Sequence, residues 1–318
     1  MTASPAPLVL LLDAVHEALP KGLAAMGFAL REAYDGGVDE IPDWEKAEGL
    51  VIRSRFPLDA AALEKAPHLR WIARVGAGLE NIDQATAEKR GITVFHAPEG
   101  NRDAVGEHAL GMLLSLLHHL PRADREVRQG RWRRAENRGT ELRHQTVGII
   151  GYGHMGSALA EKLQGLGCRL LLYDKYKSHY APPYAEEVRL ARLQAEADII
   201  SLHTPQTPET EGLIDAAFWR ALRKPVIFIN TARGRSVVTE DLVEALQTGQ
   251  VKGACLDVHA YEKSSFEGLA SGEVPPALRY LWESEQVMLS PHIAGWTHQS
   301  HRRMAEVLLF KIKQHYRL

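Results

Sequence analysis

Residues 147–156 constrain the fold of this chain more than any other segment. An apolar run ends there in three glycines spaced G-x-G-x-x-G, Gly151, Gly153 and Gly156, and a helical pattern follows. A strand, a tight glycine turn and a helix form the geometry that holds the pyrophosphate of a dinucleotide. His154 and Met155 complete the predicted binding loop, where the helix offers its N–H groups and positive dipole end to the phosphates.

A carboxylate stands where a fold of this kind contacts the ribose of its cofactor. The apolar run 169–173 follows the predicted helix and ends in Asp174, about 20 residues after the glycines. Asp174 would accept hydrogen bonds from the ribose hydroxyls and repel a 2′-phosphate, which favours NAD over NADP. The structural alternative is an exposed acid at a strand end, and Lys175 and Lys177 would weaken the preference.

Composition narrows the class of protein. A length of 318 residues predicts about two domains, and 45% hydrophobic with 25% charged residues is ordinary for a soluble globular protein. A net charge of −2 gives no general attraction for nucleic acid or an anionic membrane. Cys168 and Cys255 form neither a disulfide framework nor a metal motif, so we expect no metal and a cytoplasmic location. Residues 8–12 are too few for a signal peptide or a membrane span.

Short apolar runs alternate with helical stretches, which predicts parallel sheets with crossover helices. The predicted strands are residues 8–12, 48–52, 69–75, 92–95, 147–150, 169–173, 198–202, 226–230, 252–256 and 287–290. Residues 101–120 predict a long, largely apolar helix. Residues 122–143 predict an arginine-rich connecting arm, with an anion site as the alternative.

We therefore predict an α/β protein of two Rossmann-like, doubly wound domains. The substrate domain is discontinuous and flavodoxin-like, comprising residues 1–100 and the amphipathic helix at 297–318. Residues 101–296 form the dinucleotide-binding domain.

Three polar residues follow strands of the second domain and suggest a reaction. Arg233, Glu262 and His292 would meet at the carboxyl edge of the sheet, where ligands bind. Arg233 suits the carboxylate of a 2-keto acid. His292 can protonate the ketone oxygen, or remove the hydroxyl proton in the reverse direction, and Glu262 can stabilise and orient the protonated imidazole. Each residue alone has a structural explanation, and a lone histidine after a strand is more often structural than catalytic. The three together, with the glycine fingerprint upstream, favour hydride transfer.

The chain resembles the D-isomer-specific 2-hydroxyacid dehydrogenases over nearly its whole length. The resemblance rests on the glycine fingerprint and on the segments 201–205 with Thr210, 230–234, 257–262 and 291–295. It implies NAD as cofactor, a small 2-hydroxy or 2-keto acid as substrate, and Arg233, Glu262 and His292 as catalytic residues. It also implies a homodimer built around the long helix and the arm.

The resemblance assigns further binding residues. Cofactor contacts are expected from His203, Thr204, Pro205, Thr210, Thr231, Ala232, Asp257, Ala294 and Gly295, with Asp257 on the nicotinamide carboxamide. Substrate contacts are expected from Arg53, Ser54, Val75, Gly76 and Ala77.

The sequence leaves the identity of the substrate open. Phosphoglycerate dehydrogenases without a regulatory domain are the branch that the chain resembles most, because Arg53 and Arg55 would bind a second anionic group. The alternatives are a glyoxylate/hydroxypyruvate or general 2-ketoacid reductase and, in another class, an NAD-sensing co-repressor-like binding protein. His259 and Lys263 depart from the family pattern, which leaves the substrate-determining loops open.

Overall fold

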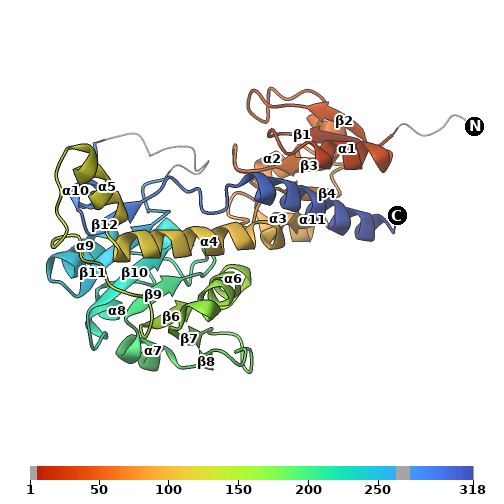
Figure 1. Ribbon diagram of the computed structural model, residues 1–318. Coiled ribbons are helices and arrows are strands. Elements are labelled where there is room, and N and C mark those ends of the chain that lie inside the picture. Colours follow the sequence, from red (N-terminus) through yellow and green to blue (C-terminus); the bar gives the residue numbers. More distant parts are fainter. Residues whose placement is uncertain (1–5, 263–272, 318) are drawn as a thin grey trace, which may run out of the picture. The chain divides into compact units, whose positions relative to one another are not determined.

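The computed structural model describes residues 6–262 and 273–317, which divide into two units (Figure 1). The first unit holds the described residues up to Asn101 and from Trp296 onward. The second holds those from Arg102 to Glu262 and the described residues up to Gly295. The boundary falls inside helix α4 (Pro98–Leu117).

The first unit is built on a parallel sheet with the order β2-β1-β3-β4-β5. Its strands are β1 (Leu8–Leu11), β2 (Ala29–Glu32), β3 (Ala47–Ile52), β4 (Trp71–Arg74) and β5 (Thr93–His96). Its helices are α1 (Ala18–Ala25), the 3-10 turn η1 (Trp44–Lys46), α2 (Ala60–Glu64), α3 (Gln84–Lys89) and α11 (His298–Tyr316).

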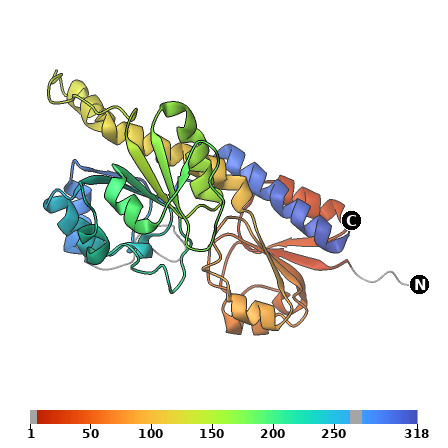
Figure 2. The same ribbon diagram turned by 90° about the horizontal axis from the view of Figure 1, so that it is seen from below.

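Both faces of this sheet are buried, because successive side chains of a strand point to opposite faces. Leu10 and Leu50 pack on the face covered by α2 and α3. Val9 and Val51 pack on the face covered by α1 and α11, and these two helices lie side by side (Figure 2). The C-terminal helix therefore completes the core of the N-terminal sheet.

The second unit is built on a parallel sheet with the order β12-β11-β10-β9-β6-β7-β8. Its strands are β6 (Thr146–Ile150), β7 (Arg169–Tyr173), β8 (Glu186–Glu187), β9 (Ile199–Leu202), β10 (Val226–Asn230), β11 (Val251–Leu256) and β12 (Val287–Leu289). The helices are α5 (Leu120–Arg128), α6 (His154–Leu163), η2 (Gln164–Leu166), α7 (Leu190–Glu196), α8 (Ala216–Arg220), η3 (Gly234–Ser236), α9 (Thr239–Gln247) and α10 (Pro276–Glu283). The strand order reverses beside β6, and ligands bind at such a switch point in doubly wound sheets.

The clearest differences from the sequence prediction concern α4, β2 and β8, and α5 forms where a connecting arm was predicted. Helix α4 begins at Pro98 rather than 101 and ends at Leu117 rather than 120, because proline is favoured at a helix start and His119 adopts a left-handed φ of 52°. Strands β2 and β8 were not predicted, since both are edge strands with mostly exposed side chains.

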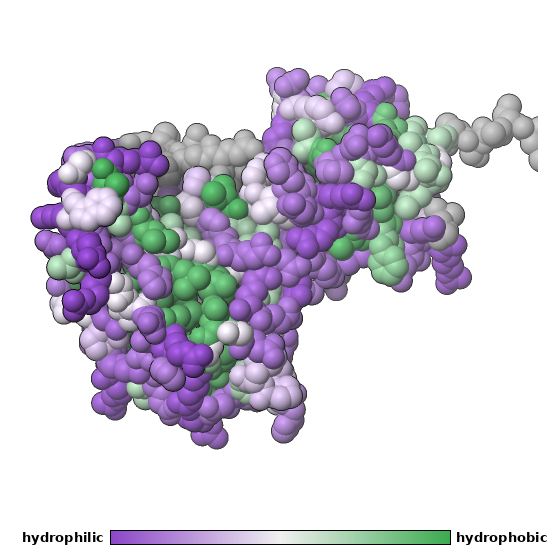
Figure 3. Space-filling view, in the orientation of Figure 1, coloured by the Kyte–Doolittle hydropathy of each residue, from purple (hydrophilic) through white to green (hydrophobic). Residues whose placement is uncertain are grey.

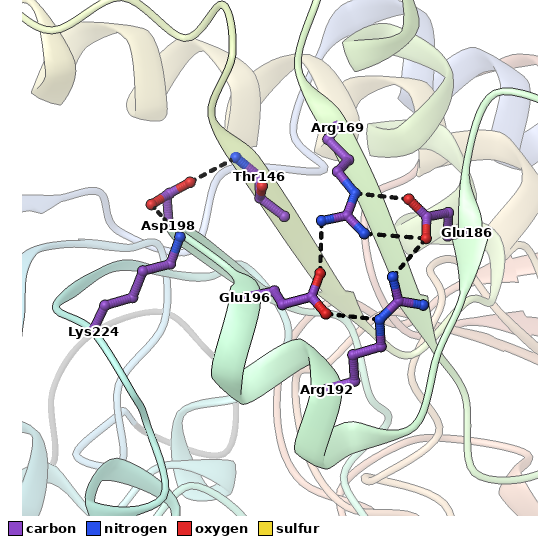
Figure 4. Close-up of polar contacts among 7 residues, drawn as sticks. All are labelled: Thr146, Arg169, Glu186, Arg192, Glu196, Asp198 and Lys224. Carbon is purple, nitrogen blue, oxygen red and sulfur yellow. Dashed lines mark hydrogen bonds and ion pairs between the residues drawn. The ribbon is translucent and has the colours of Figure 1, made fainter.

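Strand β8 pairs with β7 through its backbone, and Glu186 adds a network of ion pairs at this edge (Figure 4). Glu186 Oε1 lies 2.7 Å from Arg169 Nε on β7, and its Oε2 lies 2.9 Å from Arg192 Nη2 on α7. Both arginines also bind Glu196, at 2.6 and 2.8 Å. The Arg169 guanidinium lowers the pKa of Glu186 to about 2, with Arg192 adding to the effect.

No helix among residues 6–262 and 273–317 has the length and apolar character needed to cross a bilayer.

Candidate active site

Two glycines of this turn are required by close packing, and the third leaves open space beside the backbone. A Cβ on Gly156 would lie 2.1 Å from Gly151 O, and a Cβ on Gly151 would lie 2.7 Å from His203 O. Gly151 also has a φ of +89°, which disfavours a side chain. A Cβ on Gly153, the residue before α6, would meet nothing within 4 Å. Gly153 therefore leaves open space at a helix N-terminus, as a pyrophosphate requires. His154 and Met155 are the first residues of α6.

Asp174 closes this turn from the end of β7. Its Oδ2 accepts the N–H of Tyr152 at 2.9 Å, and its Oδ1 accepts the N–H of Tyr176 at 3.0 Å. A carboxylate has about four lone-pair positions, so both oxygens retain capacity for ribose hydroxyls.

The residues predicted to contact the adenosine side lie on the loop after β9. His203 and Thr210 have different hydrogen-bond partners within the protein. His203 is buried beside Ser201, whose Oγ lies 2.8 Å from His203 Nε2. Burial lowers the pKa of His203 to about 4, so its ring is neutral at pH 7. Thr210 Oγ1 donates to Pro205 O at 2.6 Å and accepts the N–H of Thr207 at 2.9 Å. Thr210 thus shapes the loop.

Two buried hydroxyls are candidates for contact with a ligand. Thr204 Oγ1 follows β9 and Thr231 Oγ1 follows β10, and neither has a hydrogen-bond partner within the described part of the chain. Buried polar atoms of this kind normally have a partner. Both lie past the carboxyl ends of strands near the switch point, as a dinucleotide would require. Ala232, next to Thr231, is buried.

The imidazole and the carboxylate form a short pair. His292 Nδ1 lies 2.6 Å from Glu262 Oε2, and Glu262 Oε1 accepts the N–H of His259 at 2.6 Å. Both side chains are mostly buried, with 22% and 14% exposed. His292 has a φ of +55°, and its N–H donates to Asp257 O at 2.8 Å. Such a backbone is uncommon outside glycine and indicates a position held by its surroundings.

The Asp257 carboxylate binds several groups of the loop that carries His292. Its buried carboxylate accepts the Ser290 hydroxyl at 2.6 Å and the N–H groups of Ile293 and Ala294, both at 2.8 Å. His108 Nε2 lies 3.5 Å from the same carboxylate. Burial alone would raise the pKa of Asp257, but the hydrogen bonds from His108, Ser290 and the backbone outweigh it and lower the pKa. Asp257 therefore anchors the loop that carries His292.

The contact of Asp257 with the nicotinamide, which the resemblance implies, stays a prediction. Three of the four lone-pair positions of Asp257 are taken by residues 290–294, so one is left for a ligand. Sequence reasoning missed His108 and Ser290 as supports of this site. His108 was counted only as part of an apolar helix, and nothing local relates it to a strand end far along the chain.

Arg233 lies at the same sheet edge, after β10. Its half-buried side chain donates from Nη1 to Ala232 O at 2.7 Å. The next residue, Gly234, has no room for a side chain, because its Cβ would lie 2.0 Å from the carbonyl carbon of His259. The loops that carry Arg233 and Glu262 are thus packed against each other. Gly295, the last expected cofactor contact, is half-buried.

The expected substrate residues lie in the first unit. Ser54, Val75 and Gly76 are buried, and a Cβ on Gly76 would lie 1.3 Å from Arg74 Nη1. Ala77 O lies 2.7 Å from His96 Nδ1.

Arg53 and Arg55 differ in what their guanidinium groups contact. Arg53 lies 4.0 Å over the ring of Trp296. Arg55 donates to the carbonyls of Leu12, Ala33 and Gly36. Arg55 therefore stabilises the fold of its own unit, and the hypothesis that it also binds an anionic group beside Arg53 stays a prediction.

Among the residues that the structure describes, no three histidine, cysteine or acidic side chains are grouped as metal ligands would be.

Comparison with known proteins places these features in a family. Residues 110–294 match the family described as D-isomer specific 2-hydroxyacid dehydrogenase, NAD binding domain. D-3-phosphoglycerate dehydrogenase of Mycobacterium tuberculosis (strain ATCC 25618 / H37Rv) is 35% identical over 302 residues, covering 93% of this chain and 54% of that protein. Glyoxylate reductase of Thermofilum pendens (strain DSM 2475 / Hrk 5) is 34% identical, covering 87% of this chain and 84% of that protein.

Solved structures are similar to this chain over most of its length. D-lactate dehydrogenase from Aquifex aeolicus, complexed with NAD and lactic acid, has a TM-score of 0.82 and 28% identity, covering 98% of this chain and 95% of that one. The chain spans about half the length of the first curated relatives it matches.

Proposed function

Because the chain belongs to the D-isomer specific 2-hydroxyacid dehydrogenases, we propose that it interconverts a small D-2-hydroxy acid and its 2-keto acid with NAD. The observation that carries the proposal is the Glu262–His292 pair on the sheet that also bears the glycine turn. This pair is a positioned acid and base, and the turn is a site for the cofactor.

The chain's own residues then have separate tasks. The bound cofactor carries the hydride that leaves or joins the substrate carbon. Arg233 binds the substrate carboxylate through its planar, permanent charge. In reduction, His292 donates one proton to the ketone oxygen; in oxidation it takes that proton from the hydroxyl. Glu262 stabilises the imidazolium, and Asp257 keeps the loop of His292 in place.

The cofactor site runs along the edge around β6. Gly151, Gly153 and Gly156 hold the pyrophosphate, and Asp174 the adenosine ribose. Thr204 and Thr231 offer their unpartnered hydroxyls. His203, Pro205 and Thr210 support the adenosine side, while Ala232, Ala294 and Gly295 lie toward the nicotinamide.

We propose a phosphoglycerate-dehydrogenase-like substrate preference, with Arg53, Ser54 and residues 75–77 on the substrate side. Several relatives are D-3-phosphoglycerate dehydrogenases, and Arg53 is a guanidinium suited to an anionic group. A glyoxylate/hydroxypyruvate or general 2-ketoacid reductase is the alternative within the same chemistry.

A panel of 2-keto acids tests both the proposed reaction and the proposed substrate preference. NADH oxidation is followed with 3-phosphohydroxypyruvate, hydroxypyruvate, glyoxylate and pyruvate, in wild type, Arg233→Ala and His292→Ala. We expect turnover with at least one keto acid, fastest with the phosphorylated one, and a loss of about 100-fold or more in both variants with NADH binding retained. Equal turnover in all three proteins would contradict the assigned roles. NAD binding with no turnover on any acid would favour the NAD-sensing binding protein instead.

We further propose a cytoplasmic homodimer built on α4 and the arm at 122–143. Cys168 and Cys255 are free thiols, in keeping with a reducing compartment. Val127 and Trp132 on the arm are 52% and 78% exposed, and Leu120 just before it is 54% exposed. Apolar side chains also gather on the face of the second unit around α4 (Figure 3). Exposed apolar groups of this kind are typical of an interface.

A further inference from the structure

The two lysines that follow Asp174 both have partners within the protein. Lys177 Nζ donates to Tyr152 O, 2.6 Å away, within the glycine turn. Lys175 Nζ forms an ion pair with Glu209. The expectation that these lysines weaken the preference for NAD therefore has to take Glu209 into account.

Glu209 reaches the end of β7 from the loop after β9. One carboxylate oxygen accepts from Lys175 Nζ, and the other accepts from the Tyr176 hydroxyl. The Tyr176 N–H in turn donates to Asp174 Oδ1 at 3.0 Å. Strands β7 and β9 both neighbour β6, so these contacts lie at the edge that carries the glycine turn.

NAD and NADP differ by one phosphate on the adenosine ribose. In folds of this type an acid at the end of the second strand binds the free hydroxyl, while a nearby cation accommodates the phosphate. Asp174 is the acid, and Lys175 stands beside it where such a cation would act. The side chain of Lys175 is 60% exposed, so its charge would be accessible to a phosphate if Glu209 did not pair with it.

We infer that Glu209 is a specificity-determining residue: by pairing with Lys175 and adding a negative charge near Asp174, it disfavours a ribose 2′-phosphate. The inference rests on the proposed NAD site. It assigns to the loop after β9 a part of the selectivity that is usually attributed to the end of the second strand.

Equilibrium binding to the full chain tests this without catalysis. ADP-ribose and 2′-phospho-ADP-ribose, which differ only in the phosphate, are titrated by calorimetry into wild type and Glu209→Gln. Glutamine keeps the shape and can still accept from Tyr176. We expect the ratio of the two dissociation constants to move about three- to tenfold toward the phosphorylated ligand, as suits one exposed charge pair. Binding of ADP-ribose should stay within about twofold.

Two further variants identify the cause. Glu211→Gln makes the same charge change two residues along the loop, where Glu211 lies 3.8 Å from Arg235 Nη1, and should leave the ratio unchanged. Adding Lys175→Gln to Glu209→Gln should return the ratio to the wild-type value, because the released ammonium is then gone.

The outcomes separate the inference from the proposed function. An unchanged ratio in Glu209→Gln, with ADP-ribose still bound, overturns the inference and leaves the NAD site standing. A gain that persists in the double variant overturns the role of Lys175. A wild-type chain that binds neither ligand overturns the NAD site and the inference together.

Discussion

At the scale of single residues, the catalytic proposal depends on how His292 is held. Its backbone lies in the left-handed region, its N–H is bound by Asp257 O, and its ring is bound by Glu262. The sequence allowed Arg233, Glu262 and His292 to be singled out, because each follows a strand of one parallel sheet. It did not predict that Asp257 serves the loop, since that depends on contacts with Ser290 and His108.

The pairing of Glu262 with His292 gives a first prediction. Glu262→Gln keeps the acceptor for the His259 N–H but removes the charge that supports a protonated imidazole. We expect kcat for reduction to fall at least about tenfold, with the dissociation constant of NADH unchanged. Steady-state kinetics and fluorescence titration measure the two quantities.

A nearby glutamate provides the control for this change. Glu240 accepts only the Tyr261 hydroxyl among the contacts seen in the described residues, at 2.9 Å, so Glu240→Gln should leave kcat in place. If Glu262→Gln turned over within twofold of wild type, the pair would have no part in proton transfer.

His203 gives a prediction about stability and pH. Its pKa is lowered by burial from 6.5 to about 4, so between these values the unfolded chain binds a proton that the folded chain does not. The free energy of unfolding should therefore fall as pH is lowered from 6.5 to 4, by on the order of 2–3 kcal/mol through this residue. His203→Gln should reduce that loss.

Urea unfolding at pH 7.5 and pH 5 measures the difference. The drop in unfolding free energy between these pH values should be smaller in His203→Gln than in wild type. His298→Gln, at an exposed position on α11, should behave as wild type does. Equal drops in all three proteins would mean that His203 is not buried in the neutral form.

At the scale of elements, the local hydrophobic pattern predicted the buried strands but not the edge strands. The bounds of β7 and β10 coincide with the apolar runs, because a strand buried on both faces is apolar throughout. Edge strands β2 and β8 have no such run; pairing with β1 and β7 sets their place, and β8 is further held by ion pairs. Glycine spacing indicated the turn between β6 and α6, and it also predicted that Gly153 faces the phosphates while Gly156 allows the helix to pack on the strand.

The turn itself provides the matching prediction. Gly156→Ala would place a Cβ 2.1 Å from Gly151 O, so we expect a loss of about 1–3 kcal/mol in unfolding free energy together with weaker NAD binding. Gly153→Ala meets nothing within 4 Å. It should unfold within about 1 kcal/mol of wild type and still bind NAD at least tenfold more weakly, because its methyl occupies the space of the pyrophosphate.

Thermal or urea unfolding and NAD titration of the two variants distinguish these roles. The expected pattern is one variant that loses both properties and one that loses only the cofactor. NAD binding at wild-type strength in Gly153→Ala would show that the phosphates do not approach this turn.

At the scale of the whole molecule, the arm at 122–143 of the second unit exposes apolar side chains, and the fold of that unit does not explain them. Glu126 is buried on the arm and accepts from Asn137 at 2.7 Å and from Arg133 at 3.1 Å, so hydrogen bonds within the arm connect its two ends. Its apolar side chains nevertheless point outward, with Trp132 78% exposed. A hollow of about 440 Å³ beside it is lined by Leu116, Trp282 and Met288 together with charged residues such as Arg122 and Glu285, and we propose that it receives a side chain of the second copy.

The last prediction follows from this arrangement. Trp132→Glu places a charge at the centre of the proposed interface, and aromatic side chains at such positions carry much of the binding energy. We expect the dimer dissociation constant to rise about 30-fold or more in analytical ultracentrifugation, while NAD binding is retained. Phe310→Glu on α11, where Phe310 is 62% exposed, should leave the dimer intact. A wild-type chain that sediments as a monomer at micromolar concentration, or a Trp132→Glu variant as dimeric as wild type, would rule out the arm as the interface.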